Sequence, residues 1–137
     1  KSFIIFKLRS FSRNKRKEIS KSFKVYFFDL GIRNSIIQNF NAPDLRTDTG
    51  ALWENFCILE RRKYLEQKGE SKLAYFWRTY DQKELDYVEE SAGKITGYEF
   101  KWNAKKTFKE PEEFKKRYGA EIEKIDPEIF WSFIGIK

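Results

Sequence analysis

The sequence contains no histidine and only one cysteine among its 137 residues, which narrows the chemistry it can perform. Zinc fingers, Ser-His-Asp triads, Cys-His triads and histidine-dependent nuclease motifs all need residues that are missing. Cys57 cannot form an internal disulfide, and it lies in an apolar helical pattern with Trp53, Phe56 and Ile58. We expect it to pack as a small hydrophobic side chain. Any hydrolytic site must therefore use carboxylates, lysine and a hard metal ion.

Long apolar runs are also missing. No segment can cross a bilayer, and the first residues lack the charged-then-apolar pattern of a signal peptide. We therefore expect a soluble, cytoplasmic protein with no membrane partner. The chain lacks methionine and opens on Lys-Ser-Phe-Ile-Ile, which already predicts a strand, so we expect it to be a piece of a longer protein. Its 40% hydrophobic and 18% aromatic content is enough for one packed core.

The net charge of +7 comes entirely from the N-terminal part of the chain. Residues 1–24 hold nine basic groups and one acid, Glu18, whereas residues 25–137 hold nineteen basic and twenty acidic groups. Two interpretations stay open. The segment is either an arm that contacts phosphates, because clustered Lys and Arg release counterions from nucleic acid, or a solvated linker between domains.

The N-terminal third predicts short elements. Phe3–Leu8 and Val25–Phe28 read as strands, and Ser10–Ser22 reads as a basic, polar connection between them. Asp29 then opens a helix of about two turns that Asn39–Pro43 ends.

The remainder predicts an α-β-β-β-α-β order. Asp48–Gln67 has helical periodicity, and Pro111–Gly119 is a short helix with proline in its first turn. Short turn-rich connections between the first three strands favour hairpins. The strand candidates are Leu73–Thr79, Glu84–Glu90, Ile95–Lys101 and Ile129–Ile134. This order predicts an α/β fold with a mixed sheet and helices packed on it.

An acid and an amine share one face of the third of these strands. The period of two places Glu99 and Lys101 on one side, and Tyr98 and Phe100 on the other. Such a Glu-x-Lys is also common on solvated strand faces.

The preceding strand adds a second carboxylate. Glu84 and Asp86 are expected on the same face as Val88, and a hairpin would bring Asp86 beside Glu99. Two carboxylates on adjacent strands can bind one Mg²⁺ ion. Alternatively, the acids form a polar outer face held by cross-strand pairs such as Asp86 with Lys101.

Glu54 is the third candidate, because its helical stripe contains Ile58, Arg61 and Leu65. A largely buried carboxylate needs a partner or a metal. The competing interpretation is an internal salt bridge, for instance with Arg61 or Arg78.

These residues carry a resemblance to known families. Gly50-Ala-Leu-Trp-Glu54, Asp86 and Glu99-x-Lys101 resemble the PD-(D/E)xK nuclease superfamily, particularly archaeal Holliday-junction resolvases. More closely, the chain resembles the DUF4143 domain, the C-terminal part of bacterial and archaeal AAA-type ATPases. The segments that carry this resemblance are Ser12-Arg13-Asn14, Lys24–Gly31, Asp48–Asn55, Trp77-Arg78-Thr79 and Glu84-Leu85-Asp86.

The resemblance implies a restriction-endonuclease-like domain over residues 44–137, with residues 1–43 leading in from an ATPase part. It implies a metal-dependent DNA endonuclease in which Asp86, Glu99 and Glu54 hold Mg²⁺ or Mn²⁺, and Lys101 acts on the attacking water and on phosphorane charge. DNA and the ATPase part are the expected partners. The backbone-tracking residues would be Arg13, Lys15, Arg16, Lys17, Lys105 and Lys106.

Two departures and one alternative accompany this expectation. No proline directly precedes Asp86. No Gly-x-x-x-x-Gly-Lys-[Ser/Thr] occurs either, so this chain should not hydrolyse ATP. Resolvase-like enzymes act as dimers on symmetric substrates, yet no dimer motif is evident, and the oligomeric state stays open. The alternative function is a non-catalytic module of the ATPase that recognises DNA or a protein and keeps the acids as a structural network.

Overall fold

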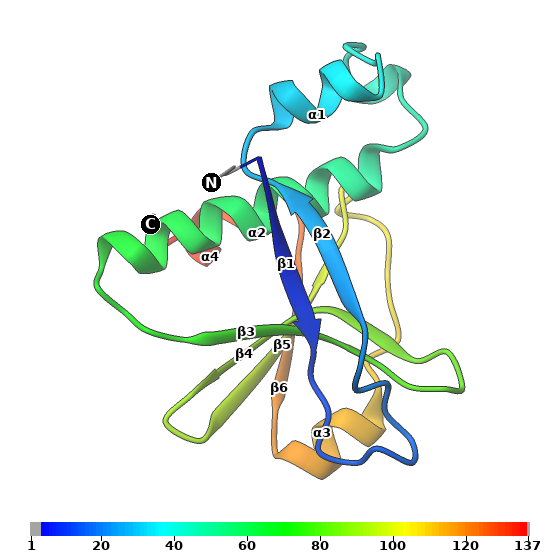
Figure 1. Cartoon of the computed structure of the whole chain (residues 1–137), viewed down its shortest axis with the longest axis vertical. Helices are drawn as coiled ribbons and strands as arrows, with labels where there is room; N and C mark the ends of the chain where they lie inside the picture. Colours follow the sequence, from blue (N-terminus) through cyan, green and yellow to red (C-terminus); the bar gives the residue numbers. More distant parts are fainter. Residues whose placement is uncertain (1–3, 137) are drawn as a thin grey trace.

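A six-stranded mixed sheet forms the centre of the computed structural model, which describes residues 4–136 (Figure 1). The strand order across the sheet is β2-β1-β3-β4-β5-β6. The strands are β1 (Ile5–Ser10), β2 (Phe23–Phe27), β3 (Leu73–Arg78), β4 (Glu84–Ser91), β5 (Lys94–Phe100) and β6 (Glu121–Ile125). The helices are α1 (Leu30–Ile36), α2 (Thr49–Gln67), α3 (Glu112–Tyr118) and α4 (Phe130–Phe133), with a 3-10 turn at Pro43–Leu45.

The pairing of the strands explains how distant segments meet. β3, β4 and β5 form the two expected hairpins, whereas β1 pairs with β3 and β5 pairs with β6 in parallel. β1 and β2 are antiparallel and complete one side of the sheet. Residues from both the basic N-terminal segment and the C-terminal half therefore belong to a single sheet. Phe3, the first residue of the first predicted strand, lies outside the described residues.

Helices cover both faces of this sheet. On one face, α2 and α4 pack on the strands through Trp53, Cys57, Ile58, Phe130 and Phe133. On the other face, Phe114 of α3 packs against Trp77, Leu85 and Val88. Cys57 is a free, buried cysteine in this core, which confirms the prediction that it packs as a small hydrophobic side chain. None of the helices in the described part of the chain is long and apolar enough to span a membrane.

The prediction of a strand at Ile129–Ile134 is wrong, because the final strand is β6 and the later segment is the short helix α4. The Asp126 side chain accepts hydrogen bonds from the backbone N–H groups of Glu128 and Ile129 and so forms the turn that leads into this helix. Trp131 of this helix is 57% exposed. The order α-β-β-β-α-β survives with β6 as its last member.

A β-bulge interrupts β4 near Asp86. The three residues of β3 from Tyr75 to Trp77 lie opposite the four residues of β4 from Leu85 to Val88, so β4 contains one extra residue there. As a result Leu85 and Val88 pack in the same cluster on the α3 face. The expectation that Asp86 shares a face with Val88 by simple alternation is therefore wrong.

Candidate active site

Asp86 and Glu99 face each other where β4 and β5 stop pairing. The last paired residues are Tyr87 and Tyr98, and the same register places Asp86 opposite Glu99 one residue further on. Instead of a ladder bond, the Asp86 carboxylate accepts the backbone N–H of Phe100 at 2.9 Å. Both acids are 8% exposed. The bulge and the end of the ladder thus aim two carboxylates at one another.

Glu54 reaches the same place from α2. The Tyr26 hydroxyl of β2 donates a hydrogen bond of 2.5 Å to Glu54 Oε2, and Lys24 Nζ lies 3.7 Å from the same oxygen. Glu54 thus forms an internal ion pair, as the competing interpretation held, but its partner is Lys24 and not Arg61 or Arg78. Arg61 pairs with Glu89, and Arg78 pairs with Glu84.

Lys101 follows β5 directly. Its Nζ lies 4.0 Å from Glu99 Oε1, and its backbone N–H donates to the Ile125 carbonyl at 2.9 Å, which fixes the chain beside β6. Tyr98 and Phe100 lie in the core on the other face, as the alternation predicted. The alternative pairing of Asp86 with Lys101 is not formed, because the ion pair of Lys101 is with Glu99.

The three carboxyl groups form a chain with Asp86 in the middle. Burial, together with hydrogen bonding and charge from Glu99, raises the pKa of Asp86 to about 7. Burial, together with the negative charge of Asp86, raises the pKa of Glu54 to about 7, although Lys24 and Tyr26 act in the opposite direction. The crowded acids therefore carry less than their full negative charge at neutral pH unless a cation joins them.

This arrangement fits a magnesium ion better than a metal with a complete protein cage. Within residues 4–136, no three acidic or cysteine side chains gather closely enough to hold an ion by themselves. Mg²⁺ needs only one or two carboxylates, because it keeps several waters and takes further oxygen ligands from substrate phosphates. Asp86 and Glu99 could supply that pair, with the Glu54 carboxyl group next to that of Asp86.

Open pockets flank the carboxylates on two sides. A pocket of about 500 Å³ is lined by Glu99, Glu84 and Phe108, and one of about 390 Å³ by Glu54, Lys24 and Tyr26. Glu99 and Glu54 therefore each border an open pocket, whereas Asp86 lies between them and lines neither pocket.

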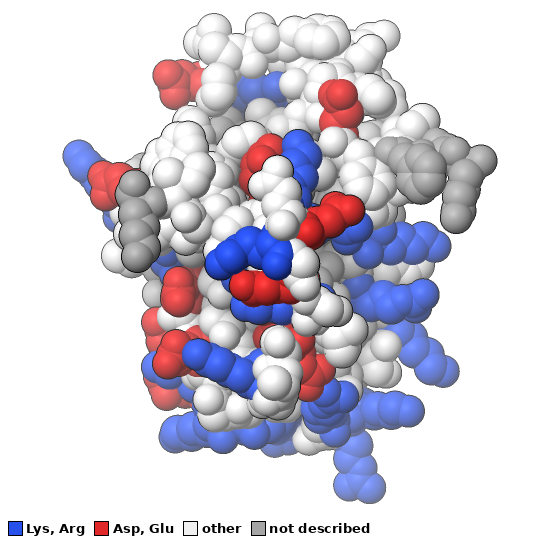
Figure 2. Space-filling view, turned by 90° about the vertical axis from the view of Figure 1, so that its left-hand side faces the viewer, with Lys and Arg blue, Asp and Glu red and all other residues white. Residues whose placement is uncertain are grey.

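The expected backbone-tracking residues lie in different places. Arg13 is engaged by Glu90 at 2.6 Å, whereas Arg16 and Lys17 line a pocket beside α3. Lys105 and Lys106 lie in the loop after β5. Lys15 is exposed in the connection between β1 and β2. Figure 2 shows Lys and Arg side chains gathered along one edge and the lower end of the molecule.

Sequence reasoning gave no role to Lys24 and Tyr26. Their spacing of two residues places them on one face of β2, which is the signal that could have paired them with an acid. It also missed Glu18, which is fully buried, and the basic residues of α3.

Comparison with protein families divides the chain near residue 45. Residues 1–43 match the model of one domain of unknown function, DUF8612. Residues 49–130 match that of another domain of unknown function, DUF4143. Searches of the curated proteins and of the solved structures find no significant match. The DUF4143 match spans more than half of the chain and includes Glu54, Asp86, Glu99 and Lys101. The chain therefore belongs to the DUF4143 family.

Proposed function

We propose that this chain is a nuclease-like domain of an AAA-type ATPase and cleaves DNA phosphodiesters with Mg²⁺ or Mn²⁺. The proposal rests on the chain of carboxyl groups from Glu54 through Asp86 to Glu99, with Lys101 beside it. These groups lie at the point where β4 and β5 stop pairing. The element order α2-β3-β4-β5-α3-β6 supports a restriction-endonuclease-like core of the PD-(D/E)xK type. β-bulges are over-represented next to active sites, and one lies at Asp86.

Asp86 and Glu99 would hold the ion, and Glu54 would support them through Asp86. When bound, Mg²⁺ supplies positive charge that polarises a phosphoryl oxygen. The Phe100 N–H fixes one oxygen of Asp86 and so keeps its carboxyl group oriented toward the other acids.

The Lys101 ammonium would donate hydrogen bonds to an attacking water and to the equatorial oxygens of the phosphorane, where negative charge develops. Its approach to Glu99 already places it at the rim of the carboxylate pair. Tyr26 and Lys24 would keep the Glu54 carboxylate oriented toward Asp86.

A second candidate function is a non-catalytic recognition module. The observation that favours it is that each acid already has a partner within the protein: Tyr26 and Lys24 for Glu54, the Phe100 N–H for Asp86, and Lys101 for Glu99. In that case the carboxyl groups are structural, and substituting them weakens the fold rather than removing an activity.

A cleavage assay tests the proposal. The parent protein is incubated with labelled single-stranded, duplex and branched DNA in Mg²⁺, in Mn²⁺ and in EDTA. We expect metal-dependent cleavage of at least one substrate, and its loss in Asp86→Asn, Glu99→Gln and Lys101→Ala. Glu66→Gln is the matched control, since Glu66 is an exposed acid of α2 that lines neither pocket beside the carboxylates. Absence of cleavage by the parent, or equal cleavage by the acid variants, would overturn the proposal.

A further inference from the structure

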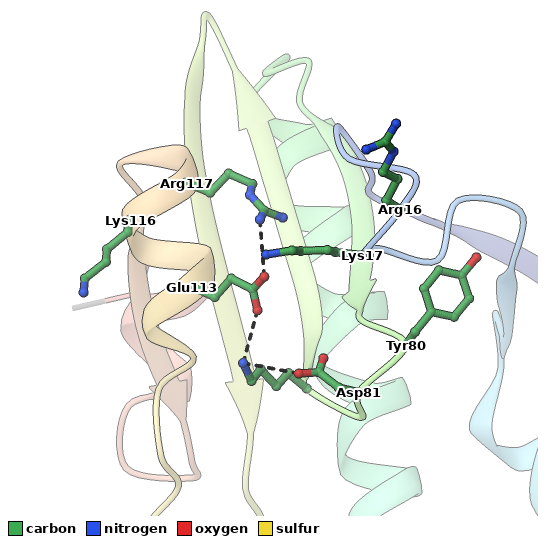
Figure 3. Close-up of a pocket in the computed structure, with 8 residues that line it drawn as sticks. Arg16, Lys17, Tyr80, Asp81, Glu113, Lys116 and Arg117 are labelled. Atoms are coloured by element: carbon green, nitrogen blue, oxygen red, sulfur yellow. Dashed lines mark hydrogen bonds and ion pairs between the residues drawn. The ribbon is translucent and has the colours of Figure 1, made fainter.

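Another open pocket, distinct from the two beside the carboxylates, lies between three segments that include α3 at the lower end of the molecule in Figure 1 (close-up in Figure 3). It has a volume of about 650 Å³. One wall comes from the connection between β1 and β2, one from the turn between β3 and β4, and one from α3. The basic lining residues are Arg16, Lys17, Lys83, Lys116 and Arg117. Two acids, Asp81 and Glu113, also line it, which leaves an excess of positive charge.

The acids of the pocket neutralise some of these cations but not all of them. Lys83 Nζ lies 3.5 Å from Asp81 and 3.2 Å from Glu113, and Arg117 lies 3.3 Å from Glu113. Arg16, Lys17 and Lys116 form no ion pair with any described residue, and all three are exposed. In Figure 3 Lys17 extends toward Glu113 and Arg117, whereas Arg16 and Lys116 point outward on opposite sides of the pocket. Three cations are therefore available to an anion.

Buried Glu18 holds the three walls together. Its carboxylate accepts hydrogen bonds from the backbone N–H groups of Arg13 and Asn14, from Trp77 Nε1 and from the Tyr118 hydroxyl. Arg117 also lies 3.4 Å from it. A backbone hydrogen bond also fixes the connection between β1 and β2 to the turn between β3 and β4, because the Tyr80 N–H donates to the Lys17 carbonyl at 3.0 Å. The pocket is thus built by the fold rather than left by a loose loop.

Tyr80 adds an aromatic surface to the basic pocket. It is 61% exposed, lies in the turn after β3, and makes no side-chain hydrogen bond to another described residue. An exposed aromatic ring beside unpaired Lys and Arg side chains is the combination with which proteins bind single-stranded nucleic acid, because every base has a face that can stack. The volume suits a nucleotide, which needs more room than a phosphate alone.

This pocket also connects with the candidate active site. Lys83 and Glu113 line both it and the neighbouring pocket that contains Glu99. A strand with one nucleotide in the basic pocket can therefore continue past Lys83 toward the carboxylates.

We infer that the pocket binds one nucleotide of a single-stranded nucleic acid, with its base stacked on Tyr80, its phosphate near Lys17, and the flanking phosphates of the strand near Arg16 and Lys116. The choice of nucleic acid as the ligand rests on the proposed function, whereas binding itself needs no catalysis. In the nuclease proposed above, the pocket would hold a nucleotide of the DNA strand close to the bond that is cleaved.

Binding to a labelled single-stranded oligonucleotide, measured by fluorescence anisotropy in EDTA at several salt concentrations, tests the inference. Tyr80→Ala should weaken binding about 5- to 150-fold, the range of one lost stacking contact, and Tyr80→Phe should restore it. Trp131→Ala is the matched control, since it removes another exposed aromatic ring outside the pocket. Inorganic phosphate and a 5′-mononucleotide are added as competitors, and we expect displacement only at millimolar concentrations.

Charge is tested separately from stacking. Arg16→Ala/Lys17→Ala/Lys116→Ala should reduce the log–log salt slope by about 2, because each lost contact to a single strand removes about 0.7. Lys63→Ala/Lys68→Ala/Lys94→Ala removes three charges that do not line the pocket and should change the slope less.

Four results would overturn the inference: no binding by the folded parent at low salt, equal affinities of Tyr80→Ala and the parent, equal slopes of the two triple variants, or displacement by micromolar mononucleotide. Because EDTA removes divalent metal, these results are independent of cleavage. A failed cleavage assay with intact Tyr80-dependent binding would remove the proposed nuclease function and leave this site standing.

Discussion

The Asp86 carboxylate accepts a hydrogen bond from the Phe100 backbone N–H at 2.9 Å, across the point where β4 and β5 stop pairing. A side chain thus replaces a ladder bond at this position. The replacement satisfies a buried N–H group and fixes the orientation of the carboxyl group. It also explains how a largely buried acid stands next to two others without leaving the backbone unsatisfied.

The pH dependence of stability follows from this crowding. The pKa values of Glu54 and Asp86 are raised to about 7 in the folded chain, above their values of 4.5 and 3.8 in the absence of such shifts. Each group therefore stabilises the fold most below about pH 4, and this contribution is lost as the pH rises through 7. In EDTA, Glu54→Gln and Asp86→Asn should each flatten the dependence and make the protein more stable than the parent at pH 8, by on the order of 3 kcal/mol.

Urea unfolding at pH 5 and pH 8 measures these differences. Glu84→Gln, an exposed neighbour, should follow the parent. Variants that are less stable than the parent by a few kcal/mol at pH 8 would instead identify the acids as a structural network, because substitution would then leave buried partners unpaired.

Glu18 gives the opposite pH behaviour. Burial tends to raise its pKa, but hydrogen bonds from Tyr118, Trp77 and two backbone N–H groups outweigh burial and lower the pKa below 4.5. Its contribution to stability is therefore present above pH 4.5 and lost as the pH falls through the lowered pKa.

Removing the Glu18 side chain should be costly, because it has several buried donors. Glu18→Ala leaves Trp77 Nε1 and Arg117 without their acceptor and should cost about 3–5 kcal/mol of unfolding free energy at pH 7. Glu121→Ala, an exposed acid on β6, should change it by less than about 0.5 kcal/mol. Thermal melts of the two variants measure this difference in stability. If Glu18→Ala destabilises the protein as little as Glu121→Ala does, Glu18 does not hold the pocket walls together.

Gly97 is required by close packing between β5 and α3. A Cβ at this position would lie 2.7 Å from Leu85 Cδ1 and 3.3 Å from Phe114 Cε1, both in the core on the α3 face. Gly97→Ala should therefore destabilise the protein by about 1–3 kcal/mol. Gly50→Ala is its control, since nothing lies within 4 Å of a Cβ there and the residue is in α2, where alanine is favoured by up to about 1 kcal/mol. Equal effects in denaturant unfolding would contradict this packing.

Regular elements with strong local signals were predictable from the sequence. The turns at Tyr80–Lys83 and Ser91–Lys94 gave both hairpins, and Asp29 caps α1 by accepting from the N–H groups of Gly31 and Ile32. β6 was missed because its Glu-Ile-Glu-Lys-Ile sequence is mostly charged, and it becomes a strand by pairing with β5. The helix after it was mistaken for a strand because its aromatic residues are typical of strands. The local signal for a helix is the Asp126-Pro127 pair that comes before it.

In the candidate site, too, the local features were predictable from the sequence and the tertiary contacts were not. The alternation of Glu99 and Lys101 is local and was predictable, and so was the meeting of Asp86 with Glu99 across a hairpin. The bulge at Asp86 depends on the register between β3 and β4, which no local pattern specifies. The partners of Glu54 come from β2, and that contact follows only from the tertiary fold.

Anomalous diffraction from a crystal soaked in Mn²⁺ near pH 8 tests the central claim most directly, because it locates the ion without requiring a substrate. We expect a peak within coordinating distance of both Asp86 and Glu99, and its loss in crystals of Asp86→Asn. Lys101→Ala should keep the peak, since this change removes a neighbouring positive charge and no ligand. A crystal with Mn²⁺ bound elsewhere, or nowhere, and with Asp86 and Glu99 accessible to solvent would contradict the metal site.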